Sequence, residues 1–223
     1  MKITVLSDDD FLSNTKLHED IIKLAEPTYE DATVVLTSAL SNFDTVYLAY
    51  NDAGNLVAFY MAGFEDLIVG DKVVPSIHLG WTCSAQESKG SGAAQLTYER
   101  FTRDGLSRQN AKGIEFLLWG TTATPIGLHL YQKHFVEVLP NPDGSYPESS
   151  VEIAEALRKR LAAPEASDHP FVLKRCHNAR FSQRELRRIE TINQESGFSL
   201  LENLGIDERQ GDRLLVTCRF RRQ

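Results

Sequence analysis

Residues 77–101 read IHLGWTCSAQESKGSGAAQLTYERF, and this stretch decides the fold. Its first part, Ile77 to Cys83, is apolar and predicts a β-strand, whereas the residues after Ala94 have the spacing of a helix. Between them, Gly90 and Gly92 predict a turn whose backbone N–H groups converge near the helix N-terminus. Such a turn is typical of a phosphate site, because the helix dipole adds partial positive charge there.

The residues after the turn show which of the common kinds of phosphate-binding loop the sequence does not match. A nucleotide triphosphatase loop needs Lys-Ser or Lys-Thr after its last glycine, but Gly92 is followed by Ala93 and Ala94. A dinucleotide-binding loop needs Gly or Ala at the position that Gln95 occupies. A tight turn without any ligand remains an alternative.

A second predicted strand and helix follow the turn, and together with it they resemble a known family. Residues 113–119 predict a strand, and residues 124–135 predict a helix that ends in LYQKHF. With the glycine turn, this pair resembles the GNAT superfamily of acyl-CoA-dependent N-acyltransferases. In that family a loop of pattern R/Q-x-x-G-x-G/A follows the fourth strand, and a later helix ends in L-Y-x-K-x-G-F, which residues 130–135 match with one residue missing. The resemblance covers roughly residues 44–135.

The resemblance implies acetyl-CoA or another acyl-CoA as co-substrate, held by the loop and its neighbours. The residues expected to bind it are Thr82, Cys83, Ser84, Ser88, Lys89, Gly90, Ser91, Gly92, Ala93 and Thr124. Two positions depart from the family pattern, since Glu87 replaces the loop Arg or Gln and Thr124 replaces an Asn. A carboxylate beside a polyphosphate repels it unless the side chain points outward, and Lys89 offsets part of that repulsion.

Acylation of an amine needs a base, a donor that polarises the carbonyl, and an acid for the departing thiolate. The family match makes Tyr131 the acid, although a tyrosine in such a helix can also pack only in the core. The strand offers His78 as the base, with Glu65 and Asp66 as alternatives that could bind an ammonium group. The resemblance also implies that a backbone N–H near Thr82 or Cys83 polarises the carbonyl.

Two further interpretations concern strand residues. Cys83 is either a small buried residue or a nucleophile that carries the acyl group. The aromatic residues Tyr60, Trp81 and Trp119 either belong to the core or line the acceptor pocket.

Composition indicates a globular enzyme. With 223 residues, 25.0 kDa and 42% hydrophobic residues, the chain is expected to form a single GNAT-like domain over residues 1–223, with a core of about 1–140 and an elaborated part of about 141–223. We find neither a membrane-length apolar run nor a signal-peptide pattern, which predicts a cytoplasmic location. The three cysteines are scattered without metal-ligand spacing, so we expect no metal and no disulfide.

The formal net charge of −7 argues against a nucleic-acid partner and suits a cationic substrate. The part from Lys174 onward is nevertheless basic, with eleven Lys and Arg against seven carboxylates. Three explanations remain open for this part: solvated helix faces, a self-association surface that would make a homodimer, or a site for an acidic partner.

The predicted fold class is α/β (α+β), of the GNAT type: a mixed, largely antiparallel central sheet flanked by helices, with extra C-terminal helices and a closing strand. Helices are expected over 17–26, 31–40, from 94 to near Gly105, 124–135, 149–161, 182–194 and 198–204. Strands are expected over 46–50, 56–62, 64–69, 73–83, 113–119, 171–175 and 212–220. Capping boxes are expected at 149–152 and 182–185, and a break at 164–170.

These observations predict transfer of an acyl group, most simply acetyl, from acyl-CoA to a small-molecule or peptidyl primary amine by direct attack. Two other functions stay open: an inactive acyl-CoA-binding sensor or scaffold, and acyl transfer to a carrier-protein thiol.

Overall fold

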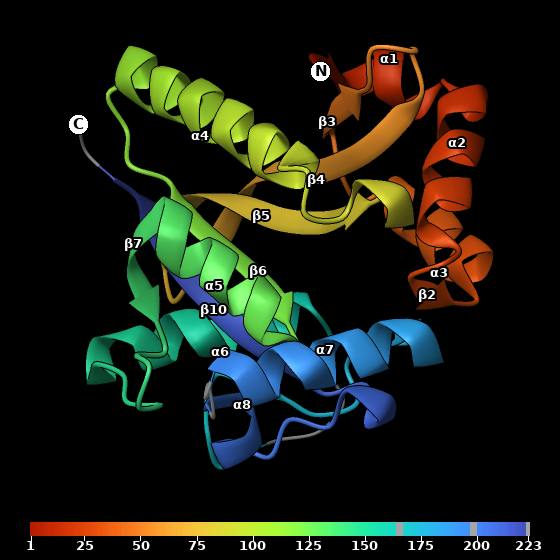
Figure 1. Ribbon diagram of the computed structural model, residues 1–223. Coiled ribbons are helices and arrows are strands. Elements are labelled where there is room, and N and C mark those ends of the chain that lie inside the picture. The colour runs from red at the N-terminus through yellow and green to blue at the C-terminus, as the bar shows by residue number, and fades with distance from the viewer. Residues whose placement is uncertain (164–166, 197–199, 222–223) are drawn as a thin grey trace. The chain divides into compact units, whose positions relative to one another are not determined.

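The computed structural model describes residues 1–163, 167–196 and 200–221 (Figure 1). Two compact units make up the chain. The first unit is Met1–Phe64 with His78–Ile114, and the second unit is Glu65–Ile77 with Glu115–Gln223. Each is described by itself below.

The first unit contains the strands β1 (Lys2–Ser7), β2 (Tyr29–Glu30) and β3 (Thr45–Tyr50), most of β4 (Leu56–Val69) and the end of β5 (Lys72–Ser84). Its helices are α1 (Asp8–Leu12), α2 (Thr15–Ala25), α3 (Ala32–Leu40), the short 3₁₀ helix η1 (Gln86–Ser88) and α4 (Ala93–Lys112). The sheet order in this unit is β1-β3-β4-β5, and β3 pairs antiparallel with both β1 and β4.

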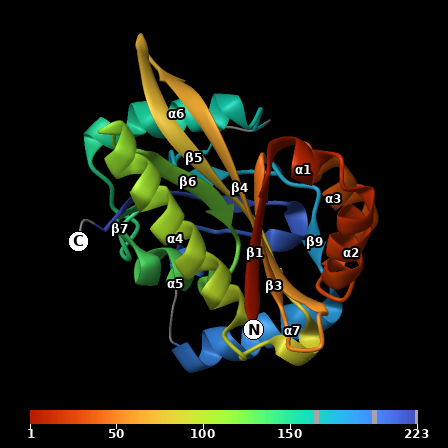
Figure 2. The same ribbon diagram turned by 90° about the horizontal axis from the view of Figure 1, so that it is seen from above.

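Successive side chains of a strand point to opposite faces of the sheet, and helices cover both faces of this one. Val46 and Leu48 point into a core that they share with α2 and α3. Tyr47, between them, points to the opposite face and meets Phe101 of α4 edge-on, with ring centroids 5.7 Å apart. Figure 2 shows α4 on one side of β1 and β3 and the pair α2 and α3 on the other.

One glycine in this core is required by a close approach. Gly80 of β5 lies against the ring of Phe43, and a Cβ at this position would collide with that ring. The absence of a side chain at Gly80 therefore lets the segment between α3 and β3 pack directly on the sheet.

The second unit contains the hairpin tip of β4 and β5, followed by β6 (Leu117–Thr122), β7 (Phe135–Leu139), β8 (Val172–Leu173), β9 (Arg180–Phe181) and β10 (Arg213–Phe220). Its helices are α5 (Pro125–His134), η2 (Glu148–Ser150), α6 (Val151–Arg160), α7 (Gln183–Ser196), α8 (Leu200–Asn203) and η3 (Glu208–Gln210). The strand order in this unit is β4-β5-β6-β10-β7, and β8 also pairs with β10.

The last strand of the chain lies inside this sheet. β10 pairs antiparallel with β6 on one side and with β7 on the other (Figure 1). β7 and β10 thus form an antiparallel pair, from Phe135 opposite Phe220 to Leu139 opposite Thr217. The residues between Leu139 and Arg213 form an insertion between these two strands, so the extra part is not an extension that follows a finished sheet.

The predicted fold class is confirmed, because a largely antiparallel sheet is flanked by helices and closed by a late strand. Several boundaries were wrong. The expected strands 56–62 and 64–69 are one strand, β4, and the strand expected over 113–119 is β6, at 117–122. Helix α4 passes Gly105, which is buried, and ends at Lys112, where Gly113 takes the left-handed conformation with φ +62°.

The two predicted capping boxes had different outcomes. Ser182 accepts the backbone N–H of Glu185 at 3.3 Å, as expected for a cap of α7. The other box, from Ser149 to Glu152, is not formed, because α6 begins one residue later with Ser150 as its N-cap. The Ser150 hydroxyl donates to the carbonyl of Pro147 and does not cap the helix. Strands β1, β2, β7 and β9 and helix α1 were not predicted. Part of the break expected at 164–170 and the start of the helix expected over 198–204 lie outside the described residues.

A buried polar network surrounds the start of β10. Asp212, 3% exposed, accepts the Lys174 ammonium at 2.7 Å, and Arg213, 5% exposed, lies 3.5 Å from Glu208. Burial alone would raise the pKa of the Asp212 carboxyl, but the hydrogen bond from Lys174 and two backbone N–H groups lower it overall. The network joins the segment around residues 174–180 to the last strand.

His177 sits beside this network in its neutral form. Burial, followed by the charges of Arg213 and Arg180, lowers the pKa of its imidazole from 6.5 to about 3. Its Nδ1 accepts the backbone N–H of Ala179 at 3.1 Å, which requires that nitrogen to be unprotonated.

We expect the chain to lose stability as the pH falls from about 6.5 towards 3, because the unfolded state then binds a proton that the folded state does not. The full contribution is present above the unfolded pKa, and the slope reaches at most about 1.4 kcal/mol per pH unit. Thermal unfolding across this range should show a shallower dependence for His177→Asn. Substitution of the exposed His129 by Asn is the control, and equal slopes for both variants would contradict the assignment.

Candidate functional site

The glycine turn begins where β5 ends. The backbone N–H of Ala85 donates to the carbonyl of Val57 at 2.8 Å, which is the last contact before the chain leaves the sheet. One turn of 3₁₀ helix follows over Gln86–Ser88. Gly90 and Gly92 then have φ of +86° and +84°, a backbone conformation that L-residues rarely adopt. The predicted turn between a strand and a helix is therefore present.

The backbone of the turn exposes N–H groups at the start of α4. The N–H groups of Ser88 and Ser91 are used inside the turn, donating to Ala85 and Ser88 at 2.9 and 3.0 Å. The first helical bond runs from Leu96 to Gly92, and no side chain caps the helix within the described chain. The N–H groups of Ala93 and Ala94 precede that bond and lie at the positive end of the helix dipole.

Space is open at both glycines. A Cβ built on Gly90 or on Gly92 would meet no atom of the described residues within 4 Å. The glycines are thus required by backbone conformation, and their Cα atoms face open space. An anion can approach the backbone closely on this side.

The side chains of the turn have distinct surroundings. Glu87 is exposed to solvent. The ammonium group of Lys89 donates to the Thr28 hydroxyl at 3.3 Å. Ala93 is 1% exposed and packs with Ala49, Val57 and Ala58, which seats the first turn of α4 on the sheet.

His78 and Thr82 lie on β5 of the first unit. The ring of His78 is half-buried and tilted against the ring of Phe43, with centroids 4.9 Å apart. Thr82 uses its hydroxyl as a donor to the carbonyl of Phe59 at 3.2 Å. Both contacts hold these side chains to the sheet.

Cys83 is a buried residue of the same strand. It is 5% exposed, and its sulfur lies 3.4 Å from the Thr28 hydroxyl and 3.7 Å from the carbonyl of Ser84. The thiol belongs to the core cluster that α2 and α3 cover. This environment fits the interpretation of Cys83 as a small core residue.

The other predicted residues belong to the second unit. Thr124 caps α5, because its hydroxyl oxygen accepts the N–H of Gly127 at 3.0 Å. Tyr131 follows on the same helix and is 4% exposed, with its ring 6.3 Å from that of Phe135. The helix ends at His134, and Phe135 begins β7 directly, which accounts for the residue missing from the family motif.

Several candidates have other roles. Tyr60 and Trp119 have no exposed side-chain surface, which favours the core interpretation, whereas Trp81 is half-buried against Tyr29. Glu65, one alternative base, forms an ion pair with Arg160 at 3.0 Å.

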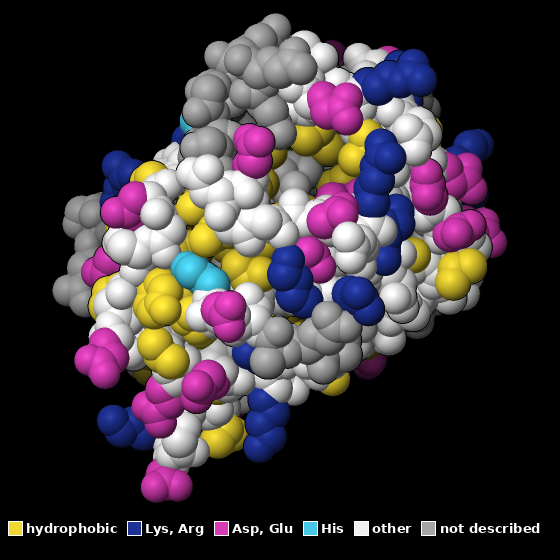
Figure 3. All heavy atoms as spheres, turned by 90° about the horizontal axis from the view of Figure 1, so that it is seen from below, with side chains coloured by type: hydrophobic (Ala, Val, Ile, Leu, Met, Phe, Trp, Pro, Cys, Tyr) yellow, Lys and Arg dark blue, Asp and Glu magenta, His cyan; other side chains and the backbone are white. Residues whose placement is uncertain are grey.

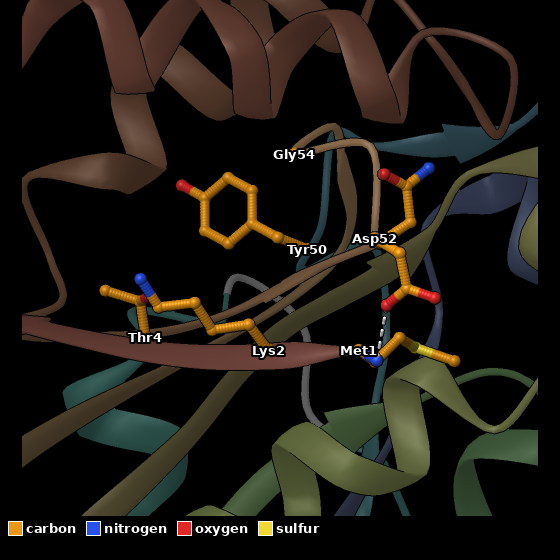
Figure 4. Close-up of a pocket in the computed structure, with 7 residues that line it drawn as sticks. Met1, Lys2, Thr4, Tyr50, Asp52 and Gly54 are labelled. Carbon is orange, nitrogen blue, oxygen red and sulfur yellow. Dashed lines mark hydrogen bonds and ion pairs between the residues drawn. The ribbon is translucent and has the colours of Figure 1, made fainter.

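A cavity of about 570 Å³ lies elsewhere in the first unit, and it contains none of the predicted site residues. It lies between β1 and the turn after β3, and Tyr50, Asp52 and Gly54 help to line it (Figure 4). The Met1 amino group and Asp52 form an ion pair across its edge at 3.1 Å. The cavity gives no support to the predicted site.

The first unit thus contains His78, the strand end Thr82–Ser84 and the turn 88–93, and the second unit holds Thr124 and Tyr131 on one helix. Sequence analysis missed Thr28, which contacts both Cys83 and Lys89. It lies 61 residues before Lys89 and carries no local signal, so no pattern could have found it.

Two general features of the described residues bear on the class of protein. None of their helices combines the length and hydrophobicity needed to cross a membrane. No group of three or more His, Cys, Asp or Glu side chains within the described ranges could hold a metal ion.

No protein-family model and no curated protein matches the sequence. Solved structures with a similar arrangement include a probable N-acyltransferase of Enterococcus faecalis V583, at 16% identity and a TM-score of 0.42, over 60% of this chain and 32% of that chain. The match therefore spans about a third of the Enterococcus chain.

Two other similar structures are described as acetyltransferases or as bound to acetyl-CoA. One is a mutant AtaT toxin in complex with the C-terminus of the antitoxin AtaR and acetyl-CoA, at 18% identity and a TM-score of 0.42, over 59% of this chain and 81% of that chain. The other is the aminoglycoside 6'-N-acetyltransferase of Acinetobacter haemolyticus, at 17% identity and a TM-score of 0.40, over 60% and 88%.

Proposed function

We propose that this chain is an acyl-CoA-dependent N-acyltransferase of the GNAT type, which transfers an acyl group, most simply acetyl, to a primary amine. The observation that carries the proposal is the backbone of residues 88–94. Two left-handed glycines face open space, and an uncapped helix begins immediately after them. This arrangement suits the diphosphate of coenzyme A.

The residues that would hold the co-substrate offer three kinds of group: backbone N–H groups, a charged side chain and a hydroxyl. The start of α4 offers the backbone N–H groups of Ala93 and Ala94, and Lys89 adds a positive charge. Glu87 is exposed, so solvent and salt screen the repulsion between its carboxylate and a phosphate. Thr124 uses its oxygen to cap α5 and keeps its hydroxyl proton for donation.

The acyl-CoA supplies an acyl group activated as a thioester. A bond forms between the amine nitrogen and the acyl carbon, and the carbon–sulfur bond breaks. In this proposal His78 takes the proton that the amine loses, and the Tyr131 hydroxyl gives a proton to the departing sulfur. The backbone around Thr82 and Cys83 would donate to the carbonyl oxygen.

The acceptor and the location complete the proposal. A small-molecule or peptidyl amine suits the net charge of −7, because an acidic protein attracts ammonium groups. The expected location is the cytoplasm, where acyl-CoA is the donor of acyl groups.

Native mass spectrometry of the purified chain, with and without added acetyl-CoA, tests the proposal. We expect a mass increase that matches the coenzyme and a calorimetric binding signal for coenzyme A. A second assay then follows thiol release from acetyl-CoA with a panel of primary amines. A chain that neither binds coenzyme A nor releases thiol would rule the proposal out.

A catalytically inactive acyl-CoA sensor is the second candidate. Glu87 favours it, since this residue stands where the family pattern has Arg or Gln. The same two assays separate the candidates, because a sensor binds acetyl-CoA without releasing thiol for any amine of the panel.

A further inference from the structure

Thr28 lies where the turn and the end of β5 meet the segment after α2. Its hydroxyl oxygen accepts two contacts, one from the Lys89 ammonium at 3.3 Å and one from the Cys83 thiol at 3.4 Å. Thr28 is 5% exposed, and its backbone N–H donates to the carbonyl of Ala25 at 2.8 Å. The backbone of Thr28 is therefore held by the end of α2, and its hydroxyl contacts the end of β5 and the turn.

The residues on either side of Thr28 also contact the end of β5 and the residues that follow it. The carbonyl of Pro27 accepts the Gln86 side-chain amide at 3.5 Å, and the ring of Tyr29 meets the Trp81 ring edge-on at 4.9 Å. Pro27, Thr28 and Tyr29 therefore each contact a residue between the end of β5 and the turn. Figure 1 shows the short yellow coil before α4 beside α2.

The contact with Lys89 has a consequence for a bound anion. A free lysine side chain samples many rotamers, and holding it in one costs up to about 2 kcal/mol. The Thr28 hydroxyl restrains the ammonium before any ligand arrives, and Lys89 directly precedes Gly90 in the turn. An ammonium group that is already restrained loses less conformational entropy when it binds a phosphate.

We propose that Thr28 is a positioning residue of the turn, whose hydroxyl holds the Lys89 ammonium in place for the phosphates of coenzyme A. This inference rests on the proposed function. Thr28 acts only through Lys89, so it contributes to coenzyme affinity and not to the proton transfers.

The test is a calorimetric double-mutant cycle on the full chain, with coenzyme A as the probe. Thr28→Val keeps the shape of the side chain and removes the hydroxyl, and it should weaken binding about three- to ten-fold, the range expected for losing one restrained side chain and its hydrogen bond. Thr28→Ser keeps the hydroxyl and should stay within about two-fold of the unaltered chain. In the thiol-release assay the Val variant should raise KM for acetyl-CoA and leave kcat unchanged.

The second arm of the cycle uses Lys89→Met, which keeps the length of the side chain without its charge. On this background Thr28→Val should have no further effect on affinity. An equal loss on both backgrounds, or tighter binding by Thr28→Val, would overturn the inference. Thr102→Val, which removes a hydroxyl bonded within α4, is the matched control and should bind like the unaltered chain.

Failure of the inference and failure of the proposed function differ in the first measurement. If the unaltered chain does not bind coenzyme A, the proposed function fails and the role of Thr28 with it. If the unaltered chain binds and the two substitutions act independently, only the role of Thr28 fails. Thermal unfolding of each variant confirms that the compared proteins are folded.

Discussion

Gly92→Ala should lower the affinity for coenzyme A about ten-fold or more, equivalent to about 1.4 kcal/mol. Gly92 has φ +84° and directly precedes the first residue of α4. An alanine pays a penalty of about 1 kcal/mol in this conformation, which the chain can relieve by rotating the backbone. That rotation turns the N–H of Ala93 away from the position where an anion would accept it.

The chain supplies a matched control for this variant. Gly54 has φ +82°, and a Cβ there would also meet no described atom within 4 Å, but this glycine lies in the turn between β3 and β4. Gly54→Ala should cost the same stability as Gly92→Ala and leave coenzyme affinity unchanged. Calorimetry and thermal unfolding of both variants decide the matter. Equal affinity for both would remove the glycine turn from the site.

Tyr131→Phe should lower kcat about 100-fold, the effect of losing a general acid, while KM for acetyl-CoA changes little. Tyr131 is 4% exposed, so its ring contributes to the core of the second unit. Phenylalanine keeps that ring and removes only the hydroxyl, which makes the variant a test of chemistry rather than of folding.

A second tyrosine of the same unit controls for loss of a hydroxyl. Tyr146 packs its ring against His169 and Phe171, and Tyr146→Phe should retain full activity. Steady-state kinetics with a fixed amine and varied acetyl-CoA give the comparison. A Tyr131 variant with unchanged kcat and a raised KM would move this residue from proton transfer to coenzyme binding.

The parts of the fold predicted from sequence are those with strong local signals. Apolar runs gave β3 and β5, and the turn at Gly90 and Gly92 was found because only glycine suits its backbone. The end of α4 was misplaced because Gly105 resembles a stop signal, whereas in the structure it is a buried position inside the helix. Local sequence does not reveal whether a glycine ends a helix or permits close packing.

The parts that were missed depend on partners distant in sequence. None of the residues of β1 is fully buried. The strand is ordered by pairing with β3, about forty residues later in the chain, from Lys2 opposite Tyr50 to Ser7 opposite Thr45. The contact between Thr28 and Lys89 spans 61 residues and leaves no periodic trace. Contacts between residues far apart in the sequence depend on how whole helices and strands pack, and a single sequence does not show that packing.

The position of β10 between β6 and β7 constrains the order of assembly. During synthesis β6 and β7 leave the ribosome long before their shared neighbour, so both carry unsatisfied backbone groups until the residues up to Phe220 arrive. Closure of a sheet by such a late partner slows folding, because the chain must first bring distant segments together. Nascent chains stalled before residue 213 should therefore recruit chaperones, and the second unit becomes resistant to proteases only after its final strand has been inserted.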